Sequence, residues 1–144
     1  KSIYAIAGNY RCHDAKERFP DFYDNVVLSA VFENGMQGVI DGAQGVRYGY
    51  DARVEVLGTE GCIFLGKTAE NGMRVCTKDM QCRNEYVNSW KYLFKDAYLE
   101  EDAAFIKCII EDSMPVADGH DGRMAVQAVN AGNLSIKEAR VVLC

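Results

Sequence analysis

Two tyrosines, Tyr48 and Tyr50, are separated by a single residue just before an alternating apolar segment that predicts a strand. In an extended segment, residues i and i+2 point to the same side. A phenol can offer an apolar ring face to C–H groups and a hydroxyl to a polar group. The pair could therefore line a pocket, contact a second subunit or fill a core, and the residues alone leave all three alternatives open.

The two histidines have no neighbouring residues in the sequence that would complete a metal site or a catalytic site. His13 is next to Cys12 in a polar stretch that predicts a loop, and no second ligand pair follows at metal spacing. His120 comes just ahead of a predicted helix, without a nucleophile or base beside it. The sequence has no GxSxG and no GxGxxG segment. We interpret both histidines as solvated loop residues and expect no metal site and no complete active site.

The six cysteines do not form a disulfide or metal pattern. No CxxC occurs, and the closest pair is Cys76 and Cys82. Cys62 and Cys108 lie inside apolar patterns, where a free thiol behaves as a small hydrophobe. We therefore expect reduced, structural cysteines in a cytoplasmic protein.

Composition excludes several classes of partner. The 144 residues carry a net charge of −5 and no basic patch that would attract nucleic acid or an anionic membrane surface. No apolar run approaches the roughly 18 residues of a membrane span. The length suits one domain over residues 1–144, which we expect to bind neither nucleic acid nor membrane.

Apolar periodicity predicts strands first and helices later. The predicted strands are residues 2–7, 26–32, 36–42, 52–57, 62–65, 73–77 and 140–144. Asn34-Gly35 indicates a hairpin with a type I′ turn, in which both central residues have positive φ. Another turn is predicted at residues 66–72.

After residue 88 the spacing becomes helical. One helix is predicted from a Ser89 cap to Met114-Pro115, and a second begins near Asp121. Small residues on one side of the second helix suit close packing: Ala125, Ala128 and Gly132. Strands, then helices, then one strand predict an α+β fold, with a large open, predominantly antiparallel or mixed β-sheet and helices packed on one face.

Five segments can be compared with known families by their order and spacing. They are DNVVLSAVFENGMQGVID, YGYDARVEVLGTEGCI, AYLEEDAAFIKCIIEDSMPV, DGRMAVQAVNAGNLS and RVVL. Together they cover nearly the whole chain and resemble the C-terminal domain of the glucose–fructose oxidoreductase / inositol dehydrogenase / MocA (Gfo/Idh/MocA) family. The YGYD segment is most similar to the inositol 2-dehydrogenase members.

The resemblance implies a substrate-binding and oligomerisation domain of an NAD(P)-dependent dehydrogenase that acts on the C–OH group of a cyclitol or sugar. It also implies that Tyr50, with Tyr48 beside it, reaches the polyol site. The family's Rossmann domain, the lysine of its Glu-Lys-Pro motif and its DxxxH segment have no counterpart here. Neither His13 nor His120 matches the family's catalytic histidine. We therefore expect this chain, a piece of a longer protein, to bind neither NAD nor NADP and to be inactive alone.

A different function remains open on the same fold. Some members of the family have regulatory roles, so the chain could be a non-catalytic regulatory or assembly module. Residues 26–32 and 36–41 look apolar on both faces. Since a large uncovered apolar face is rare on a soluble monomer, we expect at least a homodimer, joined sheet to sheet.

Overall fold

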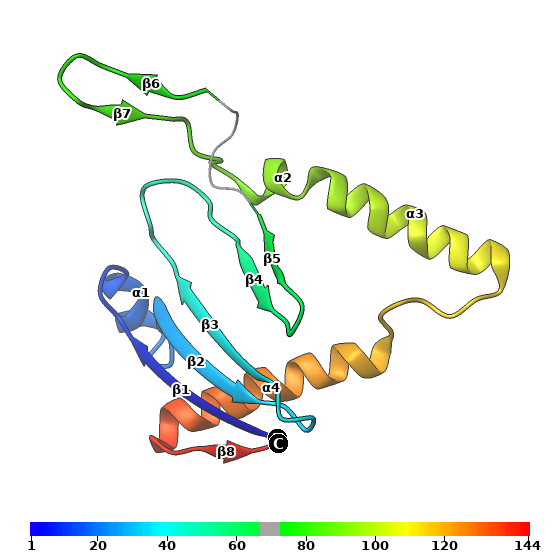
Figure 1. Ribbon diagram of the computed structural model, residues 1–144. Coiled ribbons are helices and arrows are strands. Elements are labelled where there is room, and N and C mark those ends of the chain that lie inside the picture. The colour runs from blue at the N-terminus through cyan, green and yellow to red at the C-terminus, as the bar shows by residue number, and fades with distance from the viewer. Residues whose placement is uncertain (67–72) are drawn as a thin grey trace. The chain divides into compact units, whose positions relative to one another are not determined.

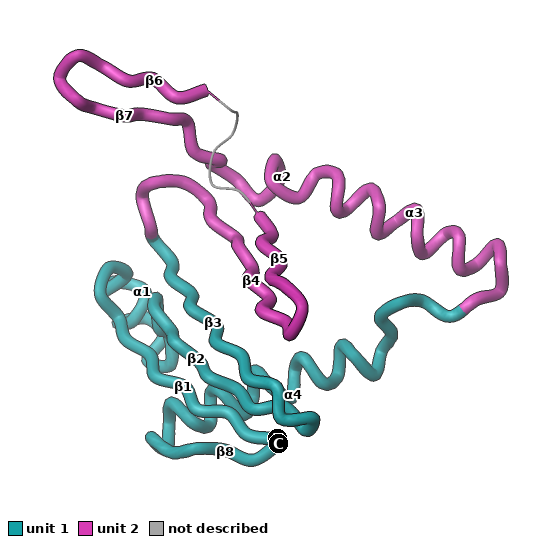
Figure 2. Tube along the Cα trace, in the orientation of Figure 1, with its two compact units in different colours: residues 1–45, 114–144 teal, residues 46–113 magenta. Residues whose placement is uncertain are grey.

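The computed structural model describes residues 1–66 and 73–144, which divide into two compact units (Figure 2). One unit consists of residues 1–45 and 114–144, and the other of residues 46–113. The predicted turn at 66–72 lies, apart from Gly66, outside the described residues. Among the described helices, none combines the length and the apolar character needed to cross a membrane.

The first unit contains a four-stranded antiparallel sheet with the order β3-β2-β1-β8 (Figure 1). Its elements are β1 (Ser2–Gly8), α1 (His13–Arg18), β2 (Asn25–Val31), β3 (Gln37–Ala43), α4 (Gly119–Glu138) and β8 (Val142–Leu143). α4 packs against β1 and β8 on one face of the sheet. The predicted α+β class, with an open antiparallel sheet, is confirmed.

The core of this unit lies between α4 and the sheet. Ile3, Ala131 and Val142 are buried together, and Leu28 packs against them. Small side chains allow α4 to approach closely: a Cβ added at Gly132 would lie 3.0 Å from Leu28 Cδ1. Of the predicted small residues, Ala128 and Gly132 pack against the sheet, whereas Ala125 is exposed.

Ser135 ties α4 to the sheet through its hydroxyl. The side chain is fully buried. Its Oγ accepts a hydrogen bond from the Ala5 N–H at 3.0 Å and donates one to the Arg140 carbonyl at 2.6 Å. β8 pairs with β1 only as far as Ile3. Beyond that point, the Ser135 hydroxyl rather than a β8 carbonyl accepts the hydrogen bond from Ala5.

The segment around His13 was predicted as a loop, and that prediction is wrong, because α1 begins at His13. The buried carboxylate of Asp24 accepts hydrogen bonds from three successive backbone N–H groups, those of Tyr10, Arg11 and Cys12, at 2.7–3.1 Å. The Cys12 bond, with those of Tyr10 and Arg11, holds the pKa of Asp24 below its ordinary 3.8 against the opposing effect of burial. The chain turns at this carboxylate and enters α1.

The hairpin between β2 and β3 is confirmed, but the predicted type I′ turn is wrong. Only Gly35, at φ 86°, has positive φ in the three-residue turn 33–35. Gly35 N–H donates to the Phe32 carbonyl, and Phe32 N–H donates to the Met36 carbonyl. This pattern is a tight turn followed by a left-handed residue, the common alternative when the loop has three residues.

Within its described residues, the second unit contains two separate antiparallel hairpins and two helices. Its elements are β4 (Val54–Leu57), β5 (Cys62–Leu65), β6 (Val75–Cys76), β7 (Cys82–Arg83), α2 (Trp90–Leu93) and α3 (Lys95–Glu111). The helix predicted from the Ser89 cap is divided at Phe94, whose backbone departs from helical geometry. α3 ends before Met114, at Asp112 with φ 49°. None of the α3 side chains is buried.

Candidate functional site

The two tyrosines lie in irregular backbone ahead of β4, and Gly49 between them determines their geometry. Gly49 has φ 132°, a conformation that side chains other than hydrogen rarely allow. A Cβ at Gly49 would lie 2.6 Å from the Val87 carbonyl oxygen and 2.8 Å from Tyr86 Cβ. Only glycine therefore lets this segment run against residues 86–87.

The backbone of Tyr50 is hydrogen-bonded, whereas its side-chain hydroxyl is not bonded to any described residue. Its N–H donates to the carbonyl oxygen of Val87 at 2.6 Å, and Val87 is 1% exposed. The half-buried Tyr50 ring meets Phe94 edge-on, with centroids 6.2 Å apart. Within the described part of the chain, the Tyr50 hydroxyl has no hydrogen-bond partner. The ring is thus fixed while its polar end can bind another molecule.

Tyr48 has different partners. Its ring contacts Tyr86 edge-on, with centroids 5.6 Å apart, and it is 52% exposed. Its hydroxyl makes a long hydrogen bond, 3.4 Å, to Asp51 Oδ2. Because Gly49 interrupts the extended backbone, the two phenols pack against separate aromatic side chains.

Asp51 and Arg53 form a two-point ion pair beside Tyr48. Arg53 Nε donates to Asp51 Oδ1 at 2.8 Å, and Arg53 Nη2 donates to Oδ2 at 2.9 Å. The Asp51 side chain is only 14% exposed, whereas that of Arg53 is 64% exposed. The hydrogen bonds and the charge of Asp51 raise the pKa of Arg53. The pair places a fixed carboxylate within reach of the Tyr48 hydroxyl.

Sequence patterns did not indicate most of these neighbours. Asp51 and Arg53 are in the YGYDAR stretch, but a side chain that pairs two residues away has no periodic signal. Tyr86 and Val87 come from a stretch that has neither helical nor strand periodicity. Phe94 lies within the helix predicted from Ser89. Its ring contact with Tyr50 depends on the folded structure, in which that helix is divided at Phe94.

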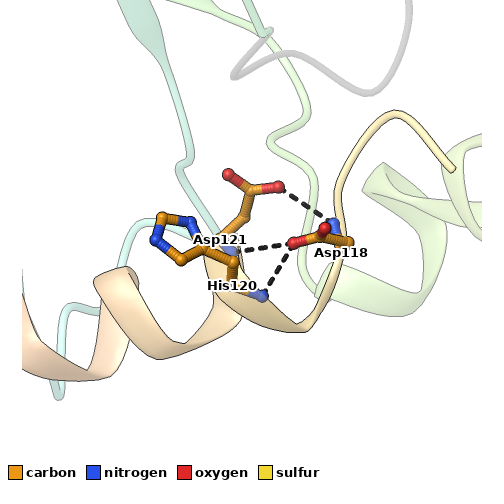
Figure 3. A group of neighbouring side chains, drawn as sticks. All are labelled: Asp118, His120 and Asp121. Carbon is orange, nitrogen blue, oxygen red and sulfur yellow. Dashed lines mark hydrogen bonds between the residues drawn. The ribbon is translucent and has the colours of Figure 1, made fainter. Parts of the chain in front are cut away.

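Both histidines belong to the first unit, whereas the two tyrosines belong to the second. His13 is the first residue of α1, and His120 is in the first turn of α4 rather than ahead of the helix. Figure 3 shows His120 with Asp118 and Asp121, whose potential ligand atoms lie within 4.8 Å of one another. All three residues are exposed.

The two carboxylates of this group already have backbone partners. Asp118 Oδ1 accepts from the N–H groups of His120 and Asp121, and Asp121 Oδ2 accepts from the Asp118 N–H at 2.9 Å (Figure 3). This reciprocal arrangement is a capping box, which satisfies N–H groups that every helix start leaves unpaired. The geometry is that of a helix N-terminus and requires no ion.

Comparison with known proteins gives a consistent set of relatives. Residues 5–143 match the family described as the oxidoreductase family, C-terminal alpha/beta domain. Myo-inositol 2-dehydrogenase of Thermotoga maritima is 34% identical over 119 residues, which are 83% of this chain and 36% of that protein. Inositol 2-dehydrogenase of Rhizobium meliloti is 27% identical over 83% of this chain and 36% of its own.

Solved structures have the same fold. A probable dehydrogenase from Thermotoga maritima superposes with a TM-score of 0.89 at 29% identity, covering 99% of this chain and 42% of its own. Scyllo-inositol dehydrogenase from Lactobacillus casei, solved with NAD(H) and scyllo-inositol, has a TM-score of 0.83 over 98% of this chain and 41% of its own. At 19% identity that likeness shows the fold alone. The chain thus spans roughly two fifths of the length of the proteins it matches.

Proposed function

This chain belongs to the Gfo/Idh/MocA oxidoreductase family, as its C-terminal α/β domain, and we propose that it is the substrate-binding and oligomerisation domain of an NAD(P)-dependent dehydrogenase. The complete enzyme oxidises the C–OH group of a cyclitol, such as an inositol, or of a sugar. The observation that carries the proposal is Tyr50, a half-buried ring held by Val87 and Phe94 whose hydroxyl has no partner in the described residues.

The chemistry of a polyol suits this tyrosine. A cyclitol presents C–H groups on its ring faces and hydroxyls around its rim, so a phenol can contact both. Since the Tyr50 backbone is fixed by Val87, the hydroxyl is positioned before the substrate arrives. Tyr48 and its Asp51 partner extend the same segment and give a second, more exposed polar contact.

The residues of this chain do not suit a dinucleotide. Binding of a pyrophosphate by this class of enzyme requires a glycine-rich turn that opens a helix, and the 144 residues contain no GxGxxG. The proposal therefore assigns NAD or NADP to a Rossmann domain outside these residues. The family's catalytic lysine, and the aspartate and proton-transferring histidine of its DxxxH segment, lie outside these residues as well. When bound, the nicotinamide accepts the hydride. This chain orients the polyol.

The test is the Tyr50→Phe variant of the full-length protein, with Tyr48→Phe as the matched control. Loss of one hydrogen bond worth about 0.5–1.5 kcal/mol lowers kcat/KM for an inositol roughly three- to tenfold. Tyr48→Phe should have a smaller effect, because the more exposed Tyr48 hydroxyl is already bonded to Asp51 and is the weaker of the two contacts proposed for the polyol. Unchanged kinetics of Tyr50→Phe with a lowered Tm would assign Tyr50 to packing. A full-length protein without dehydrogenase activity towards any cyclitol or sugar would favour the regulatory or assembly module.

The assembly part of the proposal rests on the sheet face opposite α4. Because Ile3 and Ala5 are buried on the α4 side, alternation places Tyr4 and Ile6 on the other side. The register adds Val27, Val39 and Leu143. These five residues, the open sheet face, are all exposed. Ser29 and Asp41 share this face, and its exposed apolar side chains fit a homo-oligomer contact between copies of the sheet.

Neighbouring residues on β3 provide a matched pair for testing it. Val39 lies on the open sheet face and is 72% exposed, whereas Ile40 lies on the α4 side and is 62% exposed. Sedimentation of the wild-type chain should give at least a dimer of 16.0 kDa subunits. Val39→Arg should yield monomers and Ile40→Arg should not. A wild-type monomer, or dissociation by the Ile40 change alone, would exclude the sheet-to-sheet contact.

A further inference from the structure

The hairpin of β6 and β7 brings two cysteines opposite each other. Cys76 and Cys82 are direct cross-strand partners. The turn between the strands repeats the pattern of the 33–35 turn: Thr77 N–H donates to the Gln81 carbonyl at 2.9 Å, and Met80 N–H donates to the Thr77 carbonyl at 3.1 Å. Met80 occupies the left-handed position, with φ 58°. The turn therefore sets the register that makes the cysteines face each other.

The position of this pair in the ladder favours a covalent link. Because Thr77 and Gln81 form the hydrogen-bonded pair, alternation makes the adjacent Cys76–Cys82 pair non-hydrogen-bonded. Backbones are closest at such positions, with Cα atoms about 4.5 Å apart, and side chains of opposed residues lie on the same side. Disulfides require Cα atoms about 4.4–6.8 Å apart, so the spacing suits one.

The sulfur atoms themselves are already in contact. The Cys76 Sγ lies 3.9 Å from the Cys82 Sγ, and both residues are exposed, so an oxidant can reach them. Rotation of the side chains closes the remaining separation to the roughly 2 Å of an S–S bond. The other cysteine in the β-hairpins of this unit, Cys62, has Glu55 beside its thiol, and desolvation together with that charge raises the pKa of Cys62. Cys62 therefore forms less thiolate and competes poorly with Cys76 and Cys82 for reaction with a disulfide.

We propose that Cys76 and Cys82 form a reversible dithiol–disulfide site that exchanges with small-molecule disulfides. The thiolate of one cysteine attacks the small disulfide, forming a mixed disulfide and releasing one thiol. The second cysteine then attacks its neighbour's sulfur, releasing the second thiol. The two cysteines lose two electrons and two protons, and the small disulfide is reduced to two thiols. The link joins strands that are only two residues long each.

Tryptic digestion gives a direct readout on the full-length protein. The protein is equilibrated in glutathione buffers of graded redox potential, its remaining thiols are alkylated, and it is digested. Cleavage after Arg74, Lys78 and Arg83 places Cys76 in the peptide 75–78 and Cys82 in the peptide 79–83. The expected result is a cross-linked pair of these two peptides, lighter than their sum by two hydrogen atoms, while Cys62 remains alkylated.

A turn variant links the result to the hairpin. Met80→Pro cannot adopt positive φ and loses the N–H that bonds Thr77. At the midpoint of disulfide formation, the ratio of oxidised glutathione to the square of reduced glutathione should then be at least about tenfold higher. The reason is that the two thiols no longer meet in a preformed turn. Cys62→Ser should leave the midpoint unchanged. Full alkylation of Cys76 and Cys82 in oxidised glutathione, a product limited to glutathione adducts or intermolecular links, or an unchanged midpoint in Met80→Pro would each overturn the proposal.

Discussion

Replacement of Ser135 by alanine should destabilise the first unit more than any comparable loss of a hydroxyl from the surface. The side chain is fully buried, and its Oγ is the acceptor for the Ala5 N–H and the donor to the Arg140 carbonyl. Alanine leaves the packing nearly unchanged but removes both bonds. The Ala5 N–H then faces α4 at a point where β8 no longer runs beside β1.

The expected loss of stability in Ser135→Ala depends on how accessible to water each unpaired backbone group is. An N–H left unpaired in a buried position costs about 1–3 kcal/mol. The Arg140 carbonyl is only partly buried, so its loss is closer to that of an ordinary hydrogen bond, about 0.5–1.5 kcal/mol. The expected total is about 1.5–4.5 kcal/mol, a large fraction of the 5–15 kcal/mol typical of a domain.

Urea unfolding followed by far-UV circular dichroism measures the change, with Ser113→Ala as the control at an exposed serine. Amide exchange at Ala5 gives a local measure and should accelerate about tenfold or more, since 1.4 kcal/mol corresponds to a factor of ten. If Ser135→Ala stays within about 0.5 kcal/mol of the wild type and Ala5 exchange is unchanged, the hydroxyl does not link α4 to the sheet.

Three further outcomes are expected. The pKa of Asp24 is lowered by folding, so its contribution to stability is present above its unfolded pKa near 3.8 and is lost as pH falls through the folded value. Asp24→Asn should therefore flatten the acid side of the stability profile, whereas the exposed Asp79→Asn should not. Gly49→Ala should cost about 1–3 kcal/mol from positive φ alone, against little for Gly61→Ala, whose added Cβ would meet nothing within 4 Å. Titration of NADH into this chain, followed by fluorescence, should show no saturable binding, because the chain lacks a glycine turn for the pyrophosphate.

Each of these has a contradicting result. If the stability of Asp24→Asn falls with acid as steeply as that of the wild type, the three backbone N–H groups are bound equally well by an uncharged side chain at this position. Equal stability of Gly49→Ala and Gly61→Ala would mean that neither the positive φ of Gly49 nor the approach of residues 86–87 restricts this position. Saturable NADH binding at micromolar concentrations would place a dinucleotide site within these residues.

Much of the fold followed from local patterns. Alternation located β1, β2 and β3, and Asn34-Gly35 indicated a hairpin because glycine supplies the positive φ that any such turn needs. The predicted start of α4 near Asp121 is two residues from the observed one at Gly119, where Asp118 and Asp121 form the capping box. The turn type was not predictable in the same way, because two- and three-residue loops accept the same Asn-Gly pair.

The misplaced parts depend on contacts between distant residues. α1 forms where the Asp24 carboxylate binds backbone N–H groups more than ten residues earlier, and no periodicity shows that. The candidate site has the same character. Tyr50 was identified through a resemblance, but its orientation depends on Val87 and Phe94, which approach it only in the folded chain.

The position of Ser135 and β8 in the chain has a consequence for how the first unit folds. β1, β2 and β3 pair with near neighbours, whereas the Ser135 bond to Ala5 joins residues 130 positions apart. Contacts between distant residues form later, because a longer loop must close. The outer edge of β1 therefore stays unpaired after the three-stranded meander has assembled, and an unpaired edge is a template for another chain. Aggregation during refolding should accordingly depend on how fast α4 docks rather than on how stable the meander is.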